Sequence, residues 1–107
     1  MSNCIIDEFD NKKWYLNSEL HREDGPAVEI WNGNKEWWLN GKLHRLDGPA
    51  IIYIGHCTQW FKNGKLHRLD GPAIEFCSGY DEWWVEGTLL TNDEITLLQF
   101  SKGIIDV

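Results

Sequence analysis

The sequence predicts an all-β fold: an elongated single antiparallel β-meander of hairpin repeats, followed by a short C-terminal capping helix. The first observation behind this prediction is an aromatic phrase of five residues that recurs every 23 residues, at 14–18, 37–41, 60–64 and 83–87. The second is the turn chemistry that closes each copy, and the third is the loss of the repeat near the C-terminus. A fixed period of this length indicates stacked units, each of which needs its neighbour to bury its apolar side.

The 107 residues are expected to form one domain. We place the repeats at about residues 4–26, 27–49, 50–72 and 73–90, with a C-terminal cap over 91–107. Each repeat begins with a β-branched and aromatic segment, which is typical of a strand. These first strands are expected over residues 4–8, 27–31, 50–54 and 73–77. The aromatic phrase supplies the second strand of each repeat, so the chain should form a meander of about eight strands.

The inner turn of each repeat closes the aromatic phrase. In the second repeat it is Asn40-Gly41, and Asn-Gly favours a type I′ turn because both central residues need a positive φ angle. A two-residue turn here pairs Trp38 with Leu43 across the hairpin.

The outer turn of the second repeat is another Asn-Gly pair, at 32–33. If it is also a two-residue turn, Val28 faces Trp37 on the neighbouring strand. The first aromatic of each phrase would then lie on one sheet face with the apolar residues of the first strands. The second aromatics, Tyr15, Trp38, Phe61 and Trp84, would lie on the opposite face, so that both faces are aromatic.

A second phrase, His-Arg-x-Asp-Gly-Pro-Ala, follows three of the four aromatic phrases. Its first six residues, called the step from here on, are 21–26, 44–49 and 67–72. Gly accepts backbone angles that are closed to other residues, and Pro is tolerated where a strand restarts. The step is therefore expected to be a bulge or corner that bends the sheet at the same place in each repeat.

The repeat ends after the fourth aromatic phrase. Thr91 or Asn92 is expected to cap a helix over residues 95–100, with Asp93 in its first turn and Gly103 past its end. Such a helix would cover the open edge of the last repeat, where an exposed strand invites aggregation.

Composition limits the classes of partner and the cellular location that we expect. The net charge of −7 argues against direct binding of a nucleic-acid backbone, which needs clustered Lys and Arg. The three cysteines suit reduced thiols better than a disulfide framework. No basic stretch precedes a long apolar run, so we expect no signal peptide and no membrane span. The expected location is the cytoplasm, or the cytoplasm of the host cell if the protein is viral.

The pattern Trp-x-x-Asn-Gly-Lys-x-His on a 23-residue period resembles the MORN repeat. Residues 37–48 and 60–71 carry the resemblance best, and it covers residues 4–90. Arg follows the His where usual MORN repeats have Gly, as in a variant branch found in bacterial, phage and large-virus proteins. The resemblance implies an elongated antiparallel sheet and a scaffold or binding role. Some MORN proteins associate with membranes or form dimers, and variants resemble antitoxins, so a homodimer is left open.

The step invites a catalytic interpretation, with His44 as base, Arg45 as anion clamp and Asp47 as orienting group. Three identical copies favour a structural device instead, since an enzyme needs one constellation. A zinc site is disfavoured because neighbouring steps lie about 10 Å apart across two strands. We therefore expect no enzyme activity, no metal and no cofactor.

A nucleotide-like ligand remains an alternative, because Arg beside an aromatic ring can clamp an anion. In that hypothesis the Arg residues face the side that carries Trp38. The competing hypothesis is a salt bridge from each Arg to an Asp of a neighbouring repeat.

The leading hypothesis is a non-enzymatic protein-binding module, because two aromatic faces leave apolar surface exposed. Acidic residues, including Asp106 near the C-terminus, could steer it towards a basic surface. Its size and repeat type suit a small phage or bacterial inhibitor of a host protein, anti-defence or antitoxin-like; a structural scaffold is a weaker alternative. The candidate partner-binding residues are Tyr15, Trp38, Phe61, Trp84, Arg45, Arg68, Asp81 and Glu82.

Overall fold

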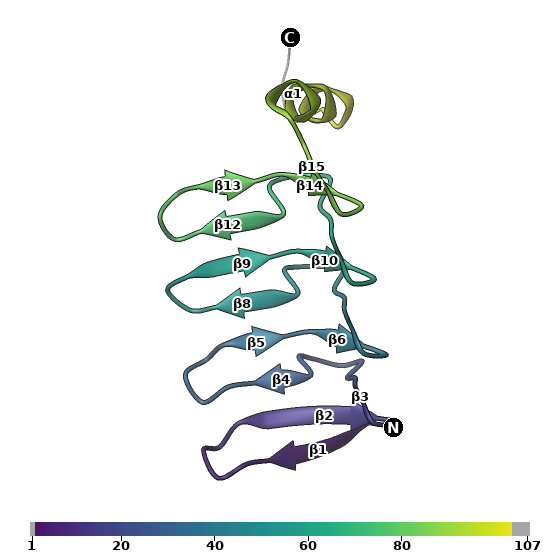
Figure 1. The fold of residues 1–107 in the computed structure, drawn as a ribbon, viewed down its shortest axis with the longest axis vertical. Coiled ribbons are helices and arrows are strands. Elements are labelled where there is room, and N and C mark those ends of the chain that lie inside the picture. The colour runs from purple at the N-terminus through teal and green to yellow at the C-terminus, as the bar shows by residue number, and fades with distance from the viewer. Residues whose placement is uncertain (1, 104–107) are drawn as a thin grey trace.

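The computed structural model describes residues 2–103 and has the predicted all-β architecture. The chain is elongated, measuring 53 × 28 × 19 Å, and its repeats stack along the long axis (Figure 1). The strands are β1 (Asn3–Ile6), β2 (Lys12–Leu16), β3 (Glu19–Leu20), β4 (Val28–Glu29), β5 (Lys35–Glu36), β6 (Trp38–Leu39), β7 (Lys42–Leu43), β8 (Ile51–Tyr53), β9 (Cys57–Gln59), β10 (Phe61–Lys62), β11 (Lys65–Leu66), β12 (Ile74–Phe76), β13 (Asp81–Glu82), β14 (Trp84–Val85) and β15 (Thr88–Leu89). The antiparallel meander of hairpins followed by one helix is confirmed.

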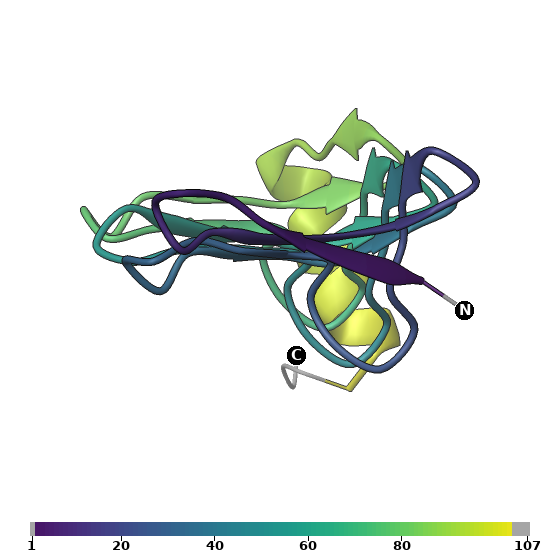
Figure 2. The same cartoon turned by 90° about the horizontal axis from the view of Figure 1, so that it is seen from below.

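The meander divides into one long sheet and three short ribbons. The long sheet runs β1-β2-β4-β5-β8-β9-β12-β13, with β3 attached to β2, and the ribbons are β6–β7, β10–β11 and β14–β15. The division falls at Trp37, Trp60 and Trp83, each of which lies between two short strands. Seen along the long axis, the long sheet is a thin layer, and the steps form stacked loops beside the ribbons (Figure 2).

The inner turns are the predicted type I′ turns. Asn40 and Gly41 have φ angles of 49° and 75°, and Trp38 pairs with Leu43. The fourth repeat keeps the geometry with Glu86 at a φ angle of 50°. The shape of the hairpin is therefore set by the two-residue loop and not by Asn alone.

The predicted register of the outer hairpin was wrong by one residue. Val28 pairs with Glu36, not with Trp37. The reason is a three-residue loop: the Gly33 amide donates to the Ile30 carbonyl oxygen at 2.9 Å, and Gly33 takes a φ angle of 98°. A type I turn followed by a left-handed residue also favours Asn-Gly, but its loop has three residues where a type I′ loop has two.

A one-residue shift moves side chains to the other sheet face. Val28, Glu36 and Ile51 share one face of the long sheet, and Glu29, Lys35 and Ile52 share the other. The expectation of two aromatic faces is thus wrong for this sheet, whose second face is largely polar.

The core is a thin line of small and medium side chains. Its buried apolar members are Ala27, Val28, Ala50, Ile51, Cys57, Ala73 and Ile74. Within residues 2–103, no large side chain is fully buried. A single layer of this kind is held together mainly by contacts from repeat to repeat.

One polar pair stands on the face that Val28 and Ile51 share. The Tyr53 hydroxyl donates to Glu36 Oε2 at 2.6 Å. Partial burial, and then this hydrogen bond to a carboxylate, raise the pKa of Tyr53 to about 12.

The helix α1 (Asn92–Ser101) begins where the sequence predicts it. Thr91 is the N-cap in a capping box with Glu94, and Gly103 has a φ angle of 70° past the end. The helix stands at the C-terminal end of the array (Figure 1), but none of its residues is buried. The helix caps the array as predicted, although Thr88 and Leu89 of β15 remain exposed. The expected acidic Asp106 and the end of the predicted cap, residues 104–107, lie outside the described residues.

Between Ser2 and Gly103, no helix has the length and apolar character needed to cross a membrane.

Candidate functional site

The three steps share one arrangement of Arg, Trp and Asp. The guanidinium of Arg45 lies over the Trp37 ring at 3.8 Å from its centroid, donates from Nε to Asp47 Oδ1 at 3.1 Å, and donates from Nη1 to the Pro49 carbonyl oxygen at 3.0 Å. Arg22 and Arg68 repeat these three contacts in the first and third steps. Each Arg thus combines a cation–π contact with an ion pair inside its own step.

This arrangement corrects the predicted position of the Arg residues. They lie over Trp14, Trp37 and Trp60, and not on the side of the second aromatics. In the later repeats the first aromatic lies between the long sheet and a ribbon, and the second lies in the ribbon, so the expected alternation across one flat sheet does not apply.

The Gly of each step permits the close approach of the Arg. A Cβ atom on Gly48 would lie 2.7 Å from Arg45 Cζ, and one on Gly71 would lie 2.7 Å from Arg68 Cζ. Neither Gly has a φ angle in the left-handed region, so the missing side chain is what the step needs.

The His of each step joins one repeat to the next. Nδ1 of His21, His44 and His67 accepts the backbone N–H of Asn40, Asn63 and Glu86, at 2.9, 2.9 and 3.0 Å. Each donor residue belongs to the inner turn of the following repeat. Because Nδ1 accepts this bond, a neutral ring carries its proton on Nε2. The repeated His is accounted for by this link.

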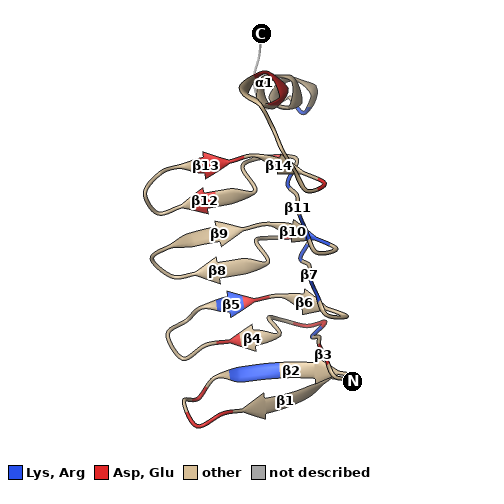
Figure 3. Cartoon of the chain, in the orientation of Figure 1, with Lys and Arg blue, Asp and Glu red and all other residues tan. Residues whose placement is uncertain are grey.

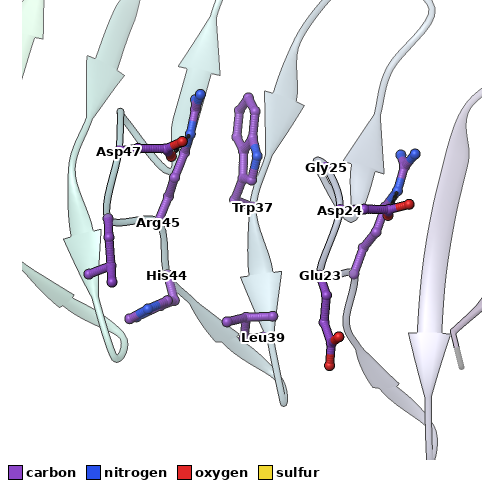
Figure 4. A pocket seen from close by; sticks show the side chains of 10 residues that line it. Glu23, Asp24, Gly25, Trp37, Leu39, His44, Arg45 and Asp47 are labelled. Carbon is purple, nitrogen blue, oxygen red and sulfur yellow. Dashed lines mark hydrogen bonds and ion pairs between the residues drawn. The ribbon is translucent and has the colours of Figure 1, made fainter.

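Two open grooves flank the central step. The first, of about 570 Å³, lies between the first and second steps, and the second, of about 370 Å³, lies between the second and third. Arg45, Leu46 and Asp47 line both. In Figure 4, Arg45 stands beside Trp37 and Asp47, and Asp24 lies on the other wall of the first groove. We call these two hollows the twin groove.

An apolar side chain stands between the two hollows. Leu46 is 71% exposed, and Leu69 occupies the same place in the third step with 36% exposure. Glu23 is the corresponding residue of the first step. Sequence reasoning missed this pair, although an apolar residue inside a polar turn was the available signal.

The eight predicted partner-binding residues fall into three places. Arg45 and Arg68 line the twin groove. The four second aromatics, Tyr15, Trp38, Phe61 and Trp84, are half-buried on β2 and the ribbons, each paired with a Leu. Asp81 and Glu82 form β13 at the far edge of the long sheet (Figure 3). The structure does not gather them into one site.

Besides the two Arg residues, three of the eight also have hydrogen-bond partners within the fold. Trp84 Nε1 donates to Glu82 Oε1 at 2.9 Å, and Trp38 Nε1 donates to Glu36 Oε1 at 2.8 Å in the equivalent place. Glu82 is therefore tied to the sheet, whereas Asp81 is exposed.

For residues 2–103, no group of three or more His, Cys, Asp or Glu side chains is placed to hold a metal ion. In comparisons with known proteins, no family model, no curated protein and no solved structure matches the chain.

Proposed function

We propose that the chain is a non-enzymatic protein-binding module whose partner docks on the twin groove. The observation that carries this proposal is Leu46, an exposed apolar side chain between two hollows that are walled by Arg and Trp. Arg and Trp are enriched among the residues that dominate binding energy, and hollows beside an apolar residue can accept a partner's side chains.

The nucleotide-like alternative is less well supported. Base stacking needs an open aromatic face, but the guanidinium of Arg45 already lies over Trp37. Nε and Nη1 of the same Arg are engaged by Asp47 and Pro49. A planar ligand would have to displace contacts that the fold uses.

The biological role that we propose is inhibition of another protein in the cytoplasm of a bacterial or infected cell, by a MORN-like repeat variant. The support is the resemblance of the repeat together with the acidity of the chain. Acidic residues are concentrated on β12 and β13 and at the tip between β1 and β2 (Figure 3), where they would steer a basic partner surface.

The test is capture from a lysate of the native host, followed by mass spectrometry. The wild-type chain is compared with Leu46→Glu and with Ile54→Glu, which alters an outer-tip residue that is 58% exposed. We expect a protein that wild type and Ile54→Glu retain and Leu46→Glu loses, with equal urea midpoints for the three chains. Retention that does not depend on Leu46 would overturn the proposed docking site.

A further inference from the structure

The three Arg residues of the steps differ in one contact. Nη1 of Arg22 also pairs with Glu29 Oε1 at 3.2 Å, and Nη1 of Arg68 also pairs with Glu75 Oε1 at 2.9 Å. The residue seven places after Arg45 is Ile52, which has no carboxylate. Among the three steps, the central guanidinium therefore has one carboxylate partner where its neighbours have two.

The central step lacks this carboxylate, but its backbone and the other contacts of its Arg are the same as in the flanking steps. Ile52 occupies the same repeat position as Glu29 and Glu75, which is the third residue after the Pro that ends each step. The other contacts of Arg45, to Trp37, Asp47 and Pro49, match those of the flanking steps. The central guanidinium is thus held in the same orientation, with its Nη1 aimed at the place where a carboxylate stands in the other two repeats.

The neighbouring strands add positive charge at this place. Ile52 pairs with Lys35 on β5 and with Thr58 on β9, and paired residues share a sheet face. Lys35 also pairs with Glu29 on its other side, and Glu29 is bound to Arg22. Glu75, in contrast, has Thr58 and Asp81 as its neighbours. A carboxylate over Ile52 would have Arg45 on one side and Lys35 on the adjacent strand β5. Neither residue paired with Ile52 is acidic.

We propose that a carboxylate of the partner protein occupies the place over Ile52 and pairs with Arg45, as Glu29 and Glu75 pair with their own Arg residues. This inference rests on the proposed protein-binding function and names the chemistry that the central step recognises: an Asp or Glu side chain next to an apolar residue that contacts Leu46. A charge-assisted bond from a guanidinium that is already oriented loses little side-chain freedom on binding. A partner surface that is otherwise basic remains compatible, because the acidic residues of β13 lie elsewhere on the sheet (Figure 3).

The first experiment uses acetate as the probe and follows the Nε–Hε signals of the Arg side chains by NMR in the full chain. We expect acetate to move the Arg45 signal and to have a far smaller effect on Arg22 and Arg68. Ile52→Glu supplies the missing carboxylate within the chain and should suppress the Arg45 response by about tenfold, whereas Ile52→Gln, of similar size and uncharged, should retain it. Glu75→Ile should create a new response at Arg68.

Two results would overturn the carboxylate site. One is an Arg45 response that persists in Ile52→Glu. The other is a response of equal size at all three Arg residues of wild type. Inorganic phosphate is titrated in parallel, and a response to phosphate without one to acetate would show that the site takes a different anion.

The second experiment uses the captured partner. Ile52→Glu should weaken its binding by about tenfold or more, since a desolvated charge pair would be lost, whereas Ile52→Gln should bind almost as wild type does. If Leu46→Glu abolishes binding but Ile52→Glu does not, the carboxylate proposal fails and the docking site stands. If neither variant changes binding, both proposals fail.

Discussion

The two long sides of the array, the side of the steps and the side of the outer tips, differ in how strictly their residues repeat. Along the side of the steps, the same His, Arg, Asp and Gly recur, and each makes the same contact in every copy. Along the outer tips, the residues and their contacts change from repeat to repeat. Asn34 Oδ1 accepts the Ile54 amide at one tip, whereas the backbone oxygen of His56 accepts the Cys77 amide at the next.

Repetition therefore marks the residues that hold the repeats together, and variation marks the places that are free to change. The tips expose apolar side chains such as Trp31, at 73%, without burying them in the next repeat. On the side of the steps, the exceptions to the repeat are the informative positions. Ile52 is such an exception where Glu29 and Glu75 stand in the other repeats, and Glu23 is one where Leu46 and Leu69 stand in the later steps.

The largest expected effect contrasts two tryptophans. Trp37→Ala removes the ring under Arg45 and should cost about 3 kcal/mol of unfolding free energy. Trp31→Ala, at an outer tip, should stay within about 0.5 kcal/mol of wild type. Urea unfolding measures both. Equal losses would mean that the tips carry as much stability as the steps.

A smaller effect is expected from filling the space beside the central Arg. Gly48→Ala places a Cβ 2.7 Å from Arg45 Cζ and should cost about 1–2 kcal/mol, because the guanidinium is pinned by its ion pair and its ring. Gly25→Ala is the matched variant, with a distance of 3.1 Å to Arg22 Cζ, and should cost less. A gain in stability for Gly48→Ala, as a simple reduction of chain entropy would give, would contradict the close-approach role.

The smallest effect concerns the face of the long sheet at high pH. The pKa of Tyr53 is raised from 10.0 to about 12, so the unfolded chain ionises first. This contribution to stability is complete below pH 10 and is lost as the pH rises towards 12. Tyr53→Phe should remove that part of the pH dependence in urea unfolding, and the ultraviolet difference titration should lose a transition near pH 12. An unchanged profile would argue against the hydrogen bond to Glu36.

Much of this fold could be predicted from the sequence. The 23-residue period predicted stacked hairpins, the Asn40-Gly41 pair predicted the inner turn, and the Thr91 region predicted the helix start. These features depend on local backbone preferences, which short segments carry by themselves.

The outer register and the stacking partners of Arg could not be predicted in the same way. Asn32-Gly33 fits both a two-residue and a three-residue loop, and the choice decides which residues of the outer hairpin share a sheet face. The position of Arg45 over Trp37 depends on the bend in the chain at that Trp, which no periodic pattern records. The twin groove was missed because the period gives the spacing of the steps but not the hollows that their side chains leave between them.

The central claim is that the repeated polar residues stabilise the stack instead of forming a reactive centre. Urea unfolding of His21→Ala, His44→Ala and His67→Ala tests it most directly, with His56→Ala at an outer tip as the control. Each of the three should lose about 1–3 kcal/mol, because each leaves a backbone N–H of the next inner turn without its acceptor, and the control should change little. A single variant that keeps wild-type stability while the other two lose it would contradict the claim.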